Sequence, residues 1–164
     1  MMPLPETPEA LPHAFAQAWN TRDADALADL FDADAEFVNV VGLWWHDREA
    51  IRRAHAYGLE VLFPDSTLRV TRVVARPLAP GVALVHARMR LTGQTAIGDV
   101  EAPQPRMNVF SFVLREVDST DTRGPGWSAV SAHNTDIVPG AETHVRDARG
   151  GLRAADYRSG RVAE

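Results

Sequence analysis

The chain has 164 residues, of which 45% are hydrophobic and 24% charged, and this is typical of one soluble globular domain. It contains no cysteine, which excludes a thiol nucleophile, a disulfide framework and a Cys-ligated metal. It also contains no lysine, so all 17 basic residues are arginines, and Schiff-base chemistry and the Walker phosphate loop are excluded. The net charge of -5 argues against a nucleic-acid partner.

The chain start predicts neither a leader nor a membrane anchor. Residues 1–6 lack a basic stretch followed by an apolar run, and no window of about 18 apolar residues occurs anywhere. We therefore expect a cytoplasmic protein without a membrane partner. Composition divides it into an N-terminal arm (residues 1–7), a folded domain (residues 8–138) and a polar C-terminal tail (residues 139–164).

Helical periodicity predicts three helices in the first part of the chain: one that begins at Pro8 or Pro12, a short one capped by Asp23, and one from Asp47 to Pro64. Residues 35–41 alternate as a strand does, with Phe37, Asn39 and Val41 on one face. A turn rich in aromatic residues is expected over residues 42–46.

From residue 67 the hydrophobic period becomes two, which predicts four long strands over residues 67–76, 82–92, 106–117 and 127–138. Their short connectors favour an antiparallel meander. Helices followed by a run of strands indicate the α+β class rather than a doubly wound fold. In the second of these strands every other residue from Ala83 to Leu91 is apolar, and we expect that face to meet the helices.

Three stretches of the sequence carry a resemblance to a known family: residues 16–31, residues 35–42, and Trp127 leading to His133-Asn134-Thr135. Together with the order of helices and strands over about residues 8–138, they resemble the SgcJ/EcaC-type branch of the SnoaL-like proteins, within the NTF2-like superfamily. The resemblance implies a cystatin-like α+β cone, in which N-terminal helices pack on a curved antiparallel sheet around a cavity.

The same resemblance implies a partner and a biological setting. Members commonly pair through the outer face of the sheet, where His86, Arg88 and Arg90 would meet carboxylates of a second subunit. The branch occurs with polyketide- and enediyne-type natural-product gene sets and carries an oxidoreductase label. The chain has no Gly-rich dinucleotide fingerprint, so we expect no nucleotide cofactor.

His55 and His133 are the candidates for acid–base catalysis. His55 lies on the apolar stripe of the third helix, and His133 shares a strand face with Trp127 and apolar neighbours, so both are expected to point inward. The alternative for each is a neutral, hydrogen-bonded core histidine. A ketosteroid-isomerase-like mechanism is not expected, because Phe15 and Trp19 stand where a tyrosine is wanted and the first strand offers only an amide.

The candidate ligand-binding residues are the aromatic and amide side chains expected around the cavity: Phe15, Trp19, Asn39, Trp44, His46, Asn108 and Asn134. The amides would orient a carbonyl or hydroxyl of a ligand, or they would serve only the sheet or the long helix. No His-x-His or His-Glu-x-x-His motif occurs, so a metal site is not expected.

We therefore predict a homodimeric protein that binds a small hydrophobic molecule in an internal cavity without a cofactor. One alternative is a cofactor-independent dehydratase, cyclase or isomerase that uses His55 or His133. A second alternative is a non-catalytic interaction module with a filled core.

Overall fold

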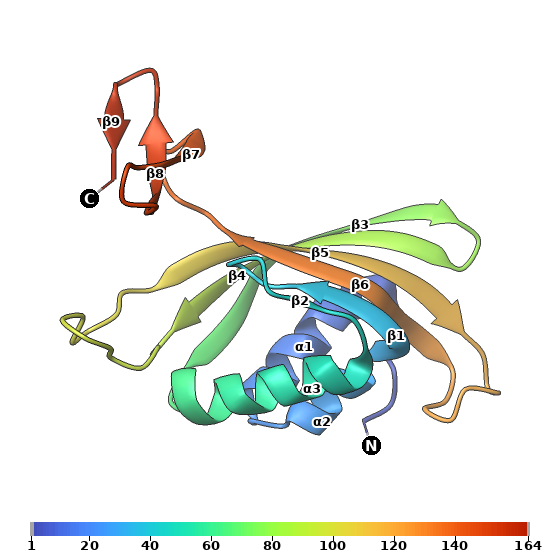
Figure 1. The fold of residues 1–164 in the computed structure, drawn as a ribbon. Coiled ribbons are helices and arrows are strands. Elements are labelled where there is room, and N and C mark those ends of the chain that lie inside the picture. The colour runs from blue at the N-terminus through green and yellow to red at the C-terminus, as the bar shows by residue number, and fades with distance from the viewer. Residues whose placement is uncertain (1, 164) are drawn as a thin grey trace.

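A computed structural model describes residues 2–163 and shows helices packed against one face of a curved sheet (Figure 1). Met1 and Glu164, predicted as the outermost residues of the arm and the tail, lie outside the described residues. The helices are η1 (Pro8–Ala10), α1 (Leu11–Asn20), α2 (Ala24–Asp29), α3 (Arg48–Tyr57) and the π-helical turn η2 (Gly58–Leu62). The strands of the sheet are β1 (Phe31–Val38), β2 (Trp44–Trp45), β3 (Thr67–Ala79), β4 (Val82–Thr92), β5 (Arg106–Val117) and β6 (Gly126–Asp136).

The six strands lie in the order β2-β1-β6-β5-β4-β3, which confirms the predicted α+β class and the meander of four long strands. The sheet is mixed and not purely antiparallel, because β1 runs parallel to β6 while all other neighbours are antiparallel. β1 also begins at Phe31, where the sequence had suggested the end of the second helix.

The helices begin where polar caps and prolines permit. Asp23 and Asp47 cap α2 and α3 by accepting backbone N–H groups of Ala26 and Ala50 at 2.8 and 2.6 Å. Pro8 opens the 3₁₀ turn and Pro12 stands in the first turn of α1, where a missing N–H costs little. The helical segment therefore begins at Pro8 as a 3₁₀ turn and continues as α1 from Leu11, the residue before Pro12.

The hydrophobic core lies between α1, α3 and the concave face of the sheet. The predicted inward face of β4 is confirmed, because its alternate residues are all at most 4% exposed: Ala83, Val85, Ala87, Met89 and Leu91. Phe15 of α1 lies at the centre, with its ring 5.4 Å from that of Phe110 and 6.1 Å from that of Phe112.

One end of the sheet is closed by a buried ion network. The guanidinium of Arg123, 8% exposed, donates to backbone oxygens of Asp29 and Phe31, to Ser128, and to the carboxylates of Asp32 and Asp121. Burial alone would raise the pKa of Asp32, but hydrogen bonds from Arg115, Ser128 and Arg123 lower it below its usual value. These contacts join the start of β1 to the ends of the strands beside it.

The predicted tail is not featureless. It forms a separate sheet of β7 (Thr143–Arg146), β8 (Leu152–Asp156) and β9 (Arg161–Val162), which projects away from the body of the molecule (Figure 1). The N-terminal arm packs on the body: Leu4 is buried, and the carbonyl of Pro5 accepts the N–H of Trp127 at 2.8 Å. Among residues 2–163, no helix has the length and apolar character needed to cross a membrane.

Candidate functional site

A pocket of about 480 Å³ opens at the end of the sheet opposite the Arg123 network. It lies between α1, α3 and the concave face of the sheet, and most of its wall is apolar. The predicted residues that line it are Phe15, Trp19, Asn39, His55, Asn108 and Asn134. A volume of this size is within the usual range for sites that hold small organic molecules.

The deep wall of the pocket is aromatic. The ring of His55 lies edge-on to Phe15, Phe37 and Trp45, with centroids 5.8, 5.1 and 5.6 Å away. Trp19 completes this wall, and its indole N–H is already used, since it donates to Oγ of Ser66 at 2.9 Å. Rings in such edge-on arrangements present flat surfaces on which a planar molecule can pack.

His55 is a neutral hydrogen-bonding group at neutral pH. Its Nδ1 lies 2.8 Å from the carbonyl oxygen of Ile51, which can only accept, so Nδ1 carries the proton and Nε2 holds a free lone pair. Burial lowers the pKa of His55 from 6.5 to about 4, and the bond to Ile51 offsets only part of this effect. At pH 7 the ring is therefore an acceptor through Nε2 and a weak base.

Two amides stand on the pocket wall with unused hydrogen-bonding capacity. Asn108 on β5 is 4% exposed, and Oδ1 of both Asn108 and Asn134 on β6 is buried without a partner among the described residues. Asn39 differs, because its Oδ1 accepts the backbone N–H groups of Val41 and Leu43 at 3.1 and 2.8 Å. Asn39 thus builds the turn after β1 as well as lining the pocket.

A charged residue that sequence reasoning missed stands beside these amides. Arg106 lines the pocket two residues before Asn108 on the same face of β5. Its Nη2 donates to Oδ1 of Asp136 at 3.1 Å and its Nη1 to Oε1 of Gln94 at 3.3 Å. Residues two apart in a strand lie on the same face, so an inward Asn108 could have predicted that Arg106 also faces inward.

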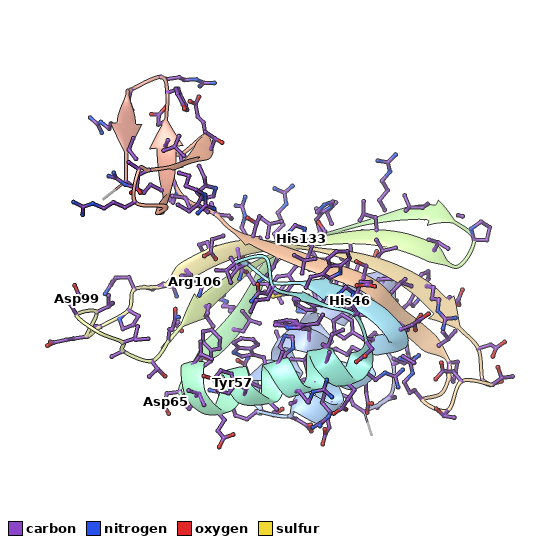
Figure 2. All side chains as sticks on the ribbon, in the orientation of Figure 1. His46, Tyr57, Asp65, Asp99, Arg106 and His133 are labelled. Atoms are coloured by element: carbon purple, nitrogen blue, oxygen red, sulfur yellow. The ribbon has the colours of Figure 1, made fainter. Side chains whose placement is uncertain are left out.

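His133 does not reach the pocket, and the prediction that it points inward is wrong. Its side chain is exposed on the face of the sheet turned away from the helices (Figure 2). A β-bulge is the cause: Leu114 pairs with Ala129 and Val113 with Ser131, so Val130 is an extra residue in β6. One extra residue reverses the alternation beyond it, which turns Asn134 inward and His133 outward.

Trp44 and His46, predicted as a pocket rim, are also on the outer side. Both bind Glu36: Trp44 donates through Nε1 at 2.5 Å, and Nδ1 of His46 lies 2.9 Å from the same oxygen. The reason is that the expected turn contains the short strand β2, in which neighbours alternate. Trp45, in the same aromatic turn, pairs with Phe37 and therefore takes the inward position and lines the pocket.

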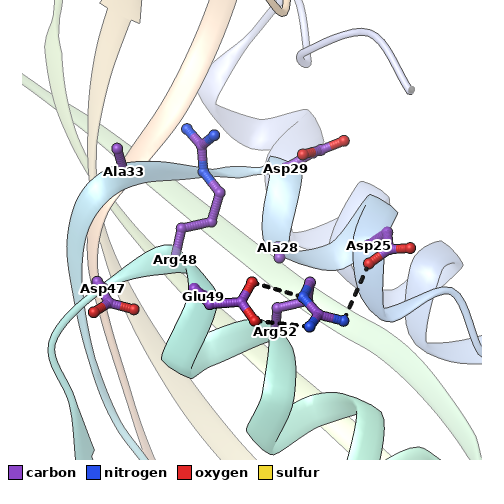
Figure 3. Close-up of a pocket in the computed structure, with 8 residues that line it drawn as sticks. All are labelled: Asp25, Ala28, Asp29, Ala33, Asp47, Arg48, Glu49 and Arg52. Carbon is purple, nitrogen blue, oxygen red and sulfur yellow. Dashed lines mark hydrogen bonds and ion pairs between the residues drawn. The ribbon is translucent and has the colours of Figure 1, made fainter.

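A second hollow, of about 460 Å³, lies between α2, α3 and β1 (Figure 3). Its walls are charged, and Arg52 pairs there with Glu49 at 2.7 Å and with Asp25 at 3.5 Å. Nε of Arg48 donates to the backbone oxygen of Phe31 at 2.8 Å. The aromatic pocket is the stronger candidate for an organic ligand, because most of its wall is apolar.

A family model described as the SnoaL-like domain matches residues 13–123. The chain belongs to the SnoaL-like domain family. The match spans α1 to the Arg123 network and so includes most of the pocket wall. A search of curated proteins gives no match for this SnoaL-like domain.

Solved structures share the fold of this SnoaL-like domain. A Caulobacter vibrioides protein with a cystatin-like fold is 28% identical, with a TM-score of 0.69 over 79% of this chain and 87% of its own. A Nostoc punctiforme domain with a cystatin-like fold is 21% identical, with a TM-score of 0.62 over 79% and 75%. A ketosteroid isomerase-like protein from Erwinia carotovora atroseptica is 20% identical, with a TM-score of 0.61 over 80% and 94%.

The chemistry available to the SnoaL-like pocket follows from its side chains. His55 is neutral and weakly basic, and Arg106 is matched by Asp136. Within residues 2–163, no group of three or more His, Asp or Glu is arranged to hold a metal ion. The neutral His55 ring can accept a hydrogen bond from a bound molecule through Nε2.

Proposed function

We propose that this SnoaL-like domain binds a small, largely apolar organic molecule in the aromatic pocket. The main support for this proposal is the pocket of about 480 Å³, whose wall includes the rings of Phe15, Trp19, Phe37 and Trp45. An interaction module with a filled core would not keep such a space, because protein interiors are otherwise close-packed. A polyketide- or enediyne-type intermediate fits this description, as membership of the SgcJ/EcaC-type branch would imply.

Binding is favoured over catalysis by the state of His55. A dehydratase, cyclase or isomerase needs a group that gains and loses a proton near the working pH. The pKa of about 4 keeps His55 unprotonated, and His133 faces away from the pocket. The enzymatic alternative would therefore require the ligand itself to change the protonation of His55.

Native mass spectrometry of the protein purified from its own host tests this proposal by the mass of a retained ligand. A complementary test is titration with naphthalene, followed by the fluorescence of the pocket tryptophans. Ala54→Trp should abolish binding, because Ala54 lines the pocket on α3, whereas Arg53→Trp places the same ring on the exposed side of that helix. Equal affinity in both variants, or absence of naphthalene binding, would overturn the proposal.

We also propose that the outer face of the sheet forms a homodimer. Arg69 lies opposite Arg90 and Arg72 opposite Arg88, all four are exposed, and within the described residues none of them forms an ion pair. Like charges that face each other on a sheet are destabilising unless a counter-charge approaches. Carboxylates of a second subunit stacked on this face would supply that counter-charge.

Sedimentation velocity at micromolar concentration tests the dimer. The wild type should sediment as a dimer and Arg72→Glu with Arg88→Glu as a monomer. Arg53→Glu, an exposed change on α3, should leave the dimer intact. A monomeric wild type, or a dimer that tolerates both sheet substitutions, would show that this face is not the interface.

A further inference from the structure

The polar groups of the pocket define the ligand more narrowly than its apolar wall does. Asn108 lies opposite Asp136 and Asn134 lies opposite Phe110 on the paired strands β5 and β6. The two asparagines are therefore diagonal neighbours on one face of the sheet, and both line the pocket. The sheet thus presents a pair of amides side by side.

These amides are unusual because their oxygens are unpaired. Oδ1 of Asn108 and of Asn134 is buried and has no hydrogen-bond partner among the described residues. Nearly all buried polar groups in folded proteins do have a partner, and an unmade hydrogen bond costs stability. Rotation about the last side-chain torsion turns either end of an amide to the pocket, so each amide can both accept and donate.

The opposite wall supplies an acceptor that cannot donate. Nδ1 of His55 is held by the carbonyl of Ile51 at 2.8 Å, which leaves Nε2 as the free polar atom of the ring. Because this nitrogen carries a lone pair, it is satisfied only by a ligand that donates a hydrogen bond. A molecule that has hydrogen-bond acceptors but no donor would leave Nε2 of His55 without a partner.

The pocket offers no free charge to a charged ligand. The guanidinium of Arg106 is matched by the carboxylate of Asp136 at 3.1 Å and by the side-chain oxygen of Gln94 at 3.3 Å. Of the other polar lining groups considered above, His55 is neutral at pH 7 and the three asparagines carry no charge. A carboxylate or an ammonium would therefore lose its hydration without gaining a partner of opposite charge.

We propose that the ligand is an uncharged aromatic molecule that carries hydroxyl groups at two edges. One hydroxyl donates to Nε2 of His55, and another lies between Asn108 and Asn134, accepting from one amide and donating to the other. The rings pack against the aromatic wall. This inference rests on the proposed binding function and specifies the class of molecule bound.

The test compares three probes of one shape: naphthalene, 2,7-dihydroxynaphthalene and naphthalene-2,7-dicarboxylate. With the full-length wild-type protein at pH 7, the diol should bind at least about tenfold more tightly than naphthalene, since it satisfies buried groups that naphthalene leaves unpaired. The dicarboxylate should bind more weakly than naphthalene. This comparison requires no substitution and so does not depend on the folding of a variant.

Variants then assign the effect to the amides. Asn108→Leu and Asn134→Leu should each reduce the ratio of diol to naphthalene affinity by about tenfold, with naphthalene binding retained. Thr135→Val is the matched control, because Thr135 follows Asn134 on β6 but is exposed, and it should leave the ratio unchanged. The ratio is measured within each variant and is therefore independent of its overall stability.

The outcomes separate this inference from the proposed function. If naphthalene binds in the pocket but the diol has no advantage, or if the dicarboxylate binds most tightly, the hydroxylated class is wrong and the binding function stands. If the diol advantage survives both leucine variants, the assignment to the amides is wrong. If no probe binds, the proposed function itself fails.

Discussion

Acidification should destabilise this protein through His55 before it affects any other group whose pKa is shifted. Burial lowers the pKa of His55 from 6.5 to about 4 in the folded state, whereas the unfolded chain keeps the ordinary value. The contribution of the neutral ring is fully present above pH 6.5 and is lost as the pH falls from 6.5 toward 4, because only the unfolded state then binds the proton. Linkage gives a loss of about 2.5 kcal/mol between pH 7 and pH 4.5.

The assay is urea unfolding at pH 7 and pH 4.5, followed by tryptophan fluorescence and circular dichroism. His55→Leu removes the titrating group, so its free energy of unfolding should change by about 2.5 kcal/mol less than that of the wild type over the same pH interval. His133→Leu is the control and should behave as the wild type, since His133 is exposed. A wild type and a His55→Leu variant with the same pH dependence would refute the reasoning, and would mean that water or local opening reaches the ring.

Three further outcomes follow from the structure. Arg123→Met should lower the free energy of unfolding at pH 7 by about 3–5 kcal/mol, because it leaves the backbone oxygens of Asp29 and Phe31 and the carboxylates of Asp32 and Asp121 without this buried donor, and a loss comparable to that of the half-buried Arg52→Met would contradict this. Gly126→Ala should cost about 2 kcal/mol in urea unfolding, since Gly126 has φ 147 and an added Cβ would lie 2.7 Å from Cβ of Leu4; an unchanged midpoint would count against this packing. His133→Gln should leave naphthalene affinity within about twofold in the fluorescence titration, and a larger loss would place His133 at the site after all.

Sequence periodicity was sufficient wherever a strand is regular. In β4 the alternation from Ala83 to Leu91 gave the buried face directly, because no irregularity interrupts the strand. In β6 the same reasoning failed at Val130, where one unpaired residue reverses the faces. Nothing in the local composition marks that position, because a bulge is chosen by the pairing of two strands and not by one strand alone.

In the candidate site, too, local periodicity predicted some residues and not others. Phe15, Trp19 and His55 were found because helical spacing places them on stripes that face the core. The sequence could not tell that Trp45 faces inward and Trp44 outward, since a strand of only two residues is too short to show its period. The partners of Arg123 lie between 2 and 94 residues away along the chain, and such a network is set by tertiary packing rather than by local sequence.

The two ends of the sheet have different roles, one in stability and one in the pocket. Hydrogen-bonded charges around Arg123 hold β1 against its neighbours at one end, while the pocket with Asn108 and His55 occupies the other. Substitutions at the pocket end can alter what the molecule selects without loosening the strands at the closed end. A lineage with this architecture can therefore drift from one small molecule to another while its scaffold is conserved, and a designer can vary the pocket residues as one library on an unchanged frame.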